Sequence, residues 1–173
     1  MRGTSLFAGL AVLATVGGVV AFKATSSSAA EAAAADEPAS LVEDFTHPDA
    51  AGILARHGLK VFKGDGHIVF DSARTFNEAQ CPTGLIQVEK HLSEDPFGMY
   101  YCFRTIGSKG FLTLEVPGTF GVRGGSEQIQ VKAKLPDGTV LPTYEVPPNQ
   151  PVAIEPGDGS QAPQAILVEL RNQ

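Results

Sequence analysis

Two cysteines, Cys81 and Cys102, are the residues whose number and spacing indicate their chemistry most directly. They are the only two among 173 residues. An even number of cysteines in an exported chain indicates a disulfide, and closing a loop of this length stabilises a fold by about 3 kcal/mol. No Cys-x-x-Cys spacing indicates a reactive thiol pair. We therefore predict a structural disulfide that holds residues 81–84 against a strand at residues 99–103.

The four histidines, His47, His57, His67 and His91, do not have the spacing of metal ligands. Two ligands on one element usually stand two apart on a strand or four apart on a helix, and no pair of these histidines does. We therefore predict no metal site and no cofactor.

The sequence also lacks a recognisable catalytic motif. A serine nucleophile in a strained turn needs Gly-x-Ser-x-Gly, and Gly124-Gly125-Ser126 lacks the second flanking glycine. Asp65 is explained by a role in a turn. We predict no catalytic residue. The alternative is a hydrolase of unrecognised type, in which replacing His67 or Asp65 abolishes turnover.

Candidate binding residues come from two segments. Tyr100 and Tyr101 belong to the densest aromatic cluster, and alternation along a strand places them on opposite faces. Phe120 and Arg123 belong to the glycine-rich residues 116–125, whose composition suits a recognition loop. We predict binding through these four side chains. The alternatives are a strand buried on both faces and a plain connection between sheets.

The amino-terminal residues have the pattern of an export signal. In residues 1–30 a basic Arg2 precedes an uncharged apolar run at residues 6–22, and small residues follow. Residues 31–42 are rich in Ala and acidic or small polar side chains, which predicts a flexible spacer. We expect cleavage, secretion and no stable membrane insertion afterwards. The alternative is an uncleaved anchor formed by residues 6–22, which are just long enough to span a bilayer.

The charge of the chain excludes one class of partner. It carries 13 basic and 19 acidic side chains and a formal net charge of −6. A nucleic-acid-binding domain needs a basic face to meet the phosphates. We therefore predict no nucleic-acid partner.

The elements that must position these residues are one helix followed by strands. Thr46 is a suitable N-cap and Gly58 a suitable stop, so we predict a helix over residues 46–57. Gly64-Asp65-Gly66 predicts a hairpin turn between the two strands that flank it. Residues 128–135 alternate most clearly, with Ile129, Val131, Ala133 and Leu135 directed inward.

Short strands with turn residues between them continue to the end of the chain. A second helix of useful length is not indicated, which argues against crossover connections. We predict a single disulfide-bridged, mainly β domain over residues 43–173. It would be an antiparallel β-sandwich or small barrel of about eight strands, preceded by one short N-terminal helix.

Two stretches of the sequence resemble small secreted β-domain proteins of actinomycetes. They are Ile53-Leu-Ala-x-His57-Gly-x-Lys60-x-x-Lys63-Gly-Asp-Gly-x-Ile68 and Gly110-Phe-Leu-Thr-Leu-Glu-Val-Pro-Gly-Thr-Phe-Gly-Val122. The resemblance covers about residues 47–125. This family is uncharacterised, so the resemblance implies an extracellular location and says nothing about chemistry.

Together these observations predict a secreted, non-catalytic domain that binds an extracellular or envelope protein or has a structural role in the envelope. A first alternative is an inhibitor of an extracellular protease, in which the loop near Cys81-Pro82-Thr83 occupies the enzyme's cleft, because a disulfide preorganises the loop it flanks. The second alternative is the hydrolase named above.

Overall fold

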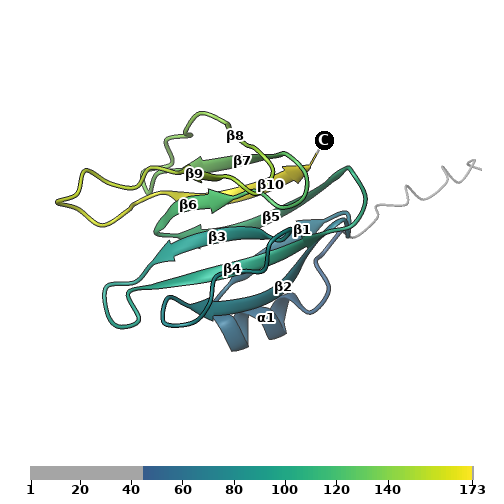
Figure 1. The fold of residues 1–173 in the computed structure, drawn as a ribbon, viewed down its shortest axis with the longest axis horizontal. Helices are drawn as coiled ribbons and strands as arrows, with labels where there is room; N and C mark the ends of the chain where they lie inside the picture. The colour runs from purple at the N-terminus through teal and green to yellow at the C-terminus, as the bar shows by residue number, and fades with distance from the viewer. Residues whose placement is uncertain (1–44, 173) are drawn as a thin grey trace, which may run out of the picture. The chain divides into compact units, whose positions relative to one another are not determined.

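The computed structural model describes residues 45–172, which form two five-stranded antiparallel sheets and one short helix (Figure 1). The predicted signal peptide at 1–30, the alternative anchor at 6–22 and the spacer at 31–42 lie outside the described residues. Within residues 45–172, no helix is both long and apolar enough to cross a membrane.

The prediction of a mainly β domain is confirmed, and the separation into two sheets makes it a sandwich. Residues 45–172 contain ten strands, where the sequence predicts about eight. Helix α1 (Ala50–His57) comes first. Sheet I contains, in spatial order, β1 (Lys60–Gly64), β5 (Gly110–Pro117), β10 (Ile166–Asn172), β7 (Ile129–Lys134) and β8 (Tyr144–Val146). Sheet II contains β2 (Ile68–Thr75), β4 (Gly98–Thr105), β3 (Ile86–His91), β6 (Thr119–Arg123) and β9 (Pro151–Ala153).

The core lies between the inner faces of the two sheets. Strand β7 buries Ile129, Val131 and Ala133, three of the four positions that the alternation of the sequence assigns to the core. Sheet II contributes the opposite layer, which includes Val88 and Phe103. Burying one such side chain contributes about 1.5–3 kcal/mol relative to leaving it exposed. This shared apolar layer therefore holds the sheets together.

Helix α1 packs against β1 and lies next to β2 at one edge of the sandwich (Figure 1). Ile53 is buried in the core, and the His57 ring packs on Phe70 of β2 with 5.1 Å between centroids. Gly58 ends the helix as predicted: its φ is 62°, and its N–H donates to the Leu54 carbonyl at 2.9 Å.

The start of the helix differs from the prediction. It begins at Ala50, so the proposed N-cap at Thr46 is wrong. Thr46 instead forms a β-bridge with Lys63, and the N–H of His47 donates to the Phe62 carbonyl at 2.8 Å. Pairing with β1 keeps these residues extended, and an extended backbone cannot start a helical turn.

The predicted hairpin at Gly64-Asp65-Gly66 is also wrong, although the turn itself is present. Strand β1 pairs with β5 and β2 pairs with β4, so the turn passes between the two sheets. Oδ1 of Asp65 accepts the N–H of Phe111 at 3.1 Å and ties this turn to the start of β5. Turn residues set the change of chain direction, but pairing far along the sequence decides which strands become neighbours.

One connection returns across sheet II. Strands β2 and β3 lie on either side of β4 and both pair with it antiparallel, so they run in the same direction. Thr75 at the end of β2 lies opposite Met99, whereas Ile86 at the start of β3 lies opposite Phe103. Residues 76–85, named the crossover segment below, must therefore run back along the sheet. The expectation of no crossover connection is wrong, because a short irregular segment makes the return without a helix.

The predicted disulfide between Cys81 and Cys102 is confirmed, with 5.6 Å between the Cα atoms, and it fixes the crossover segment on the outer face of sheet II. Tyr101 and Phe103 face the core, so Cys102 between them faces outward. Its exposed fraction is nevertheless 0%, because the crossover segment covers it. The N–H of Cys81 donates to Oε1 of the buried Gln87 in β3 at 2.9 Å.

Replacing both Cys81 and Cys102 with alanine is expected to lower the free energy of unfolding by about 3 kcal/mol, because the unfolded chain regains the freedom of the open loop. Chemical denaturation of the purified chain measures this. Hydrogen exchange should accelerate more in residues 76–87 than in sheet I. Reductant should reproduce the loss in the wild type and leave the variant unchanged. A loss below about 1 kcal/mol would contradict the structural role.

Candidate functional site

The outer face of sheet I is covered by side chains that satisfy one another. Lys60 donates to Glu115 across β1 and β5 at 2.6 Å. Glu169 of β10 accepts from Lys132 at 3.1 Å and from Arg171 at 2.8 Å. Paired charges of this kind are typical of a solvated surface. The pairs on this face neutralise the charges of Lys60, Glu115 and Glu169.

The outer face of sheet II instead carries a cluster of three aromatic side chains, Phe76, Tyr100 and Phe120. Phe76 stacks on Tyr100 with 4.6 Å between ring centroids, and the Phe76 and Phe120 rings meet edge to face at 6.1 Å. They come from the crossover segment, β4 and β6 respectively, and each is half-buried. We call them the aromatic cluster.

Phe120 reaches this face because the pairing of β3 with β6 is irregular. Glu89 lies opposite Gly121 and the next residue, Lys90, lies opposite Thr119, which leaves Phe120 as an extra residue without a partner. A β-bulge re-aims a side chain. Strict alternation would place Phe120 on the core side together with Val122, and the bulge brings it to the outer face beside Phe76.

Next to the aromatic cluster lies a recess of about 340 Å³. It is lined by Glu89 of β3, Phe120 and Gly121 of β6, residues 151–153 of β9, and Pro156. Its walls are therefore largely apolar, and the Glu89 carboxylate is the charged group among them. This combination of apolar walls with one oriented polar group is typical of binding sites.

A short chain of hydrogen bonds holds the Glu89 carboxylate in place. Nε2 of Gln87 donates to Oε1 of Glu89 at 2.8 Å, while Oε1 of Gln87 accepts the N–H of Cys81. Gln87 is 1% exposed, and both ends of its amide are occupied, so it has one orientation. The crossover segment is thereby linked to the carboxylate in the recess.

Arg123 braces the crossover segment from beneath. Its guanidinium donates to the carbonyl of Cys81 at 2.6 Å and, at 3.4 Å, to both the Pro82 carbonyl and Oε1 of Gln80. At the end of the segment, the N–H of Gly84 donates to Asn149 Oδ1 at 3.0 Å. The segment is thus an exposed loop with an internally fixed backbone.

The structure brings together some of the predicted binding residues and separates others. Tyr100 and Phe120 belong to the aromatic cluster, and Arg123 lies on the same face beneath the crossover segment. Tyr101 is 1% exposed, points into the core and donates its hydroxyl to the His57 carbonyl at 3.0 Å. Burial raises the pKa of this hydroxyl. Tyr101 is therefore not part of the exposed surface.

Sequence reasoning missed Phe76, Glu89 and Gly121. Phe76 directly follows the observed strand β2, and Glu89 lies on the outer face of β3 with Gln87. The crossover between β2 and β3 brings these residues to one surface, and no local pattern in the sequence predicts that crossover. The position of Cys81 shortly after Phe76 is the one indication that this segment touches the strand of Cys102.

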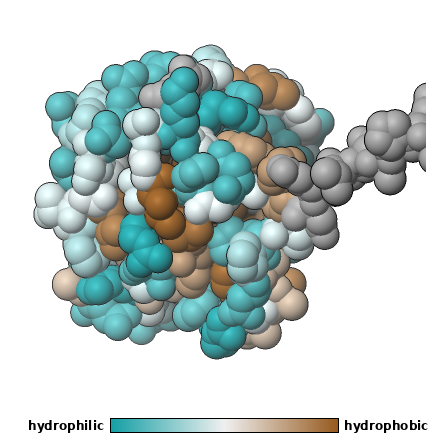
Figure 2. All heavy atoms as spheres, turned by 90° about the vertical axis from the view of Figure 1, so that its right-hand side faces the viewer, coloured by the Kyte–Doolittle hydropathy of each residue, from teal (hydrophilic) through white to brown (hydrophobic). Residues whose placement is uncertain are grey.

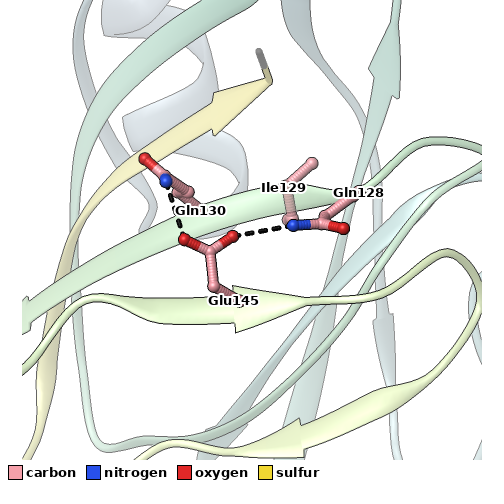
Figure 3. A pocket seen from close by; sticks show the side chains of 4 residues that line it. All are labelled: Gln128, Ile129, Gln130 and Glu145. Carbon is pink, nitrogen blue, oxygen red and sulfur yellow. Dashed lines mark hydrogen bonds between the residues drawn. The ribbon is translucent and has the colours of Figure 1, made fainter.

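A second hollow, of about 280 Å³, lies on the outer side of β7 and β8 and is polar (Figure 3). Gln128 donates to one carboxylate oxygen of Glu145 at 2.9 Å, and Gln130 donates to the other at 2.7 Å. Both amides point at the carboxylate. Because each oxygen of Glu145 already accepts a hydrogen bond from a neighbour, this hollow is a weaker candidate for a binding site than the recess at Glu89.

A groove of about 420 Å³ lies between α1 and the start of β2. Its two arginines are each paired with a carboxylate: Arg56 with Asp49 at 2.5 Å, and Arg104 with Asp71 at 3.6 Å. These charges balance, so the groove does not select a charged ligand.

The end of the sandwich at which β10 finishes faces the viewer in Figure 2, where hydrophobic side chains appear among hydrophilic ones. Near the turns at this end, Phe45 is 41% exposed and Ile106 is 48% exposed. Single exposed apolar side chains are common on protein surfaces. This end is therefore not taken as the site.

Asp65 and His67, the residues of the hydrolase alternative, lie 3.5 Å apart at the turn between the sheets. Oδ1 of Asp65 accepts the backbone N–H groups of His67 and Phe111, which gives this carboxylate a structural role. Within residues 45–172, no three His, Cys, Asp or Glu side chains are grouped so that they could hold a metal ion.

Comparison with known proteins does not assign the chain to a family. No family model matches the chain, and the search of curated proteins finds no significant match.

The Asp65 carboxyl is expected to titrate below its ordinary pKa. Partial burial raises its pKa, but the N–H groups of Phe111 and His67 and the nearby His67 ring together lower it by more. A lowered pKa in the folded state contributes stability above the unfolded-state pKa, and this contribution is lost as pH falls through the folded-state pKa. Carbon-13 NMR of the side-chain carboxyl measures the titration.

The same linkage predicts that Asp65→Asn, which keeps the acceptor oxygen, loses less stability than the wild type between pH 5 and pH 2. Denaturation at several pH values checks this difference. Glu94→Gln, at an exposed loop position, serves as the matched control and should follow the wild type. Equal acid losses in the wild type and Asp65→Asn would refute the assignment.

Proposed function

We propose that this chain is an exported, non-catalytic binding domain that recognises a protein partner through the outer face of sheet II. The observation that carries the proposal is the aromatic cluster of Phe76, Tyr100 and Phe120 beside a recess with apolar walls. Half-buried aromatic side chains supply large contact area at little entropic cost, and they are enriched where binding energy is concentrated.

The contrast between the two outer faces supports this choice of surface. Sheet I presents ion pairs together with the separate rings of Phe62 and Phe111, the second of them under the Arg171 guanidinium, whereas sheet II presents three rings in contact with one another beside the disulfide-bonded crossover segment. A surface that is already rigid loses less conformational freedom when a partner binds. This difference favours recognition by sheet II.

Export is supported by two independent features. The sequence pattern of residues 1–30 is that of a signal peptide. The bond between Cys81 and Cys102 is of a kind that forms and persists in oxidising compartments. A partner outside the cytoplasm, in the secreted or envelope fraction, follows from this location.

A second candidate function, inhibition of an extracellular protease, is favoured by the bracing of the crossover segment by Arg123. The hydrogen bonding of the Cys81 main chain makes this function less well supported than that of a binding domain. The N–H and C=O of Cys81 are bonded inward, to Gln87 and Arg123. They are therefore not free to make the main-chain hydrogen bonds by which an extended peptide adds to another chain.

Phe120→Ala is expected to weaken capture of the partner at least about tenfold, because it removes a ring from the aromatic cluster. The purified chain is immobilised and exposed to secreted and envelope fractions, and retained proteins are quantified by mass spectrometry. Phe62→Ala is the matched control, since Phe62 is an exposed aromatic residue (46%) on β1 of sheet I. It should leave capture unchanged.

Thermal unfolding of both variants shows whether either substitution acts through the fold. If the same proteins are retained by Phe120→Ala and lost with Phe62→Ala, the partner binds sheet I and the proposal fails. Retention of a protease whose activity the wild type blocks, independent of Phe120, would move inhibition to first place.

A further inference from the structure

The carboxylates that lie within strands fall into two groups. Three are paired with a cation: Asp71 with Arg104, Glu115 with Lys60, and Glu169 with Lys132 and Arg171. The other two, Glu89 and Glu145, accept hydrogen bonds from glutamine amides and have no salt-bridge partner among residues 45–172. An amide orients a carboxylate without neutralising its charge.

Glu89 differs from Glu145 in two respects. Both oxygens of Glu145 accept a bond, whereas Gln87 occupies only Oε1 of Glu89. Glu145 is exposed on the edge strand β8, while Glu89 is half-buried on β3 in the interior of sheet II. Oε2 of Glu89 is therefore an oriented acceptor in a partly desolvated place, where an interaction with a cation is stronger than in water.

The neighbouring residue on β6 keeps this oxygen uncovered. A Cβ at Gly121 would stand 3.1 Å from Oε2 and 3.3 Å from Cδ of Glu89, closer than ordinary van der Waals contact. Any larger residue at this position would displace the carboxylate from its place beside the β6 backbone by a few tenths of an ångström. The ring of Phe120 forms the adjacent wall of the recess. An aromatic ring next to a carboxylate suits a cationic side chain, whose stem packs on the ring while its charge meets the carboxylate.

We propose that the recess binds an arginine or lysine side chain of the protein partner, with its cationic group at Oε2 of Glu89 and its aliphatic stem against Phe120 and β9. The inference rests on the proposed function and names the chemistry that this surface recognises. Charge complementarity selects the occupant: the recess holds one unpaired negative charge, and the chain as a whole carries −6.

The apolar walls agree with this occupant. Lysine and arginine carry methylene stems that pack along apolar surface while the charged head meets a polar partner. Phe120, Pro151, Ala153 and Pro156 give the recess such a surface. A small inorganic cation would use the carboxylate alone and would leave these walls without contacts.

The test is a titration of the purified, disulfide-bonded and nitrogen-15-labelled chain with N-acetyl-arginine amide, followed by NMR. Amide shifts should concentrate at Gly121 and Ala153. Glu89→Gln, which keeps the contact with Gln87 and removes the charge, should weaken affinity at least about tenfold. Glu145→Gln is the matched control and should change affinity by less than about twofold. Added salt should weaken binding to the wild type.

Three results would overturn the inference. The neutral probe N-acetyl-norleucine amide could bind as well as the arginine probe, which would make the recess simply apolar. A neutral sugar such as methyl glucoside could shift the amide resonances of the recess residues while the arginine probe leaves them unchanged. Glu89→Gln could bind the arginine probe like the wild type. In each case loss of partner capture by Phe120→Ala would still support the proposed function, so the two failures are distinguishable.

Discussion

The path of the chain between β2 and β3 is the constraint on which the rest of the structure depends. Both strands pair with β4 from opposite sides and run in the same direction, so the chain must return across the sheet before β3 can begin. An irregular segment that lies over a sheet is not held there by strand pairing, since it forms no ladder of its own. The bond between Cys81 and Cys102 holds the crossover segment instead, and Arg123 and Gln87 add hydrogen bonds to the same few backbone atoms.

This return explains why the two outer faces of the sandwich have different chemistry. A face covered by another segment can carry apolar and neutral polar groups, because the segment removes them from water. Cys102 and Gln87 occupy such positions on sheet II, and Phe76 extends the cover over Tyr100. On the outer face of sheet I, by contrast, several of the charged side chains pair as ions. The hydrogen bonds that hold the return also continue through Gln87 to Glu89, so one feature orders both the loop and the recess.

Much of the fold follows from local patterns in the sequence, while the site depends on contacts between distant residues. Alternation identifies the buried face of β7, and the number of cysteines identifies their bond, because both depend on rules with one dominant solution. The start of α1 and the pairing of β1 were predicted wrongly, because bridges such as Thr46 to Lys63 outweigh local capping and turn preferences. Phe120 faces outward only through a bulge, which alternation cannot reveal. Alternation places Tyr100 and Tyr101 on opposite faces of β4, but it does not indicate which of the two faces is buried.

The way in which the crossover segment is held separates its shape from its surface. Most of the contacts that fix it use the N–H and carbonyl of Cys81, the carbonyl of Pro82 and the N–H of Gly84, and the remaining ones use the disulfide and Oε1 of Gln80. The exposed side chains of Ala79 and Thr83 take no part in those contacts. Substitution at such positions changes the surface that a binding partner contacts, while the backbone keeps its conformation. The segment is thus suited to diversification: lineages can acquire new surface chemistry here at little risk to the fold.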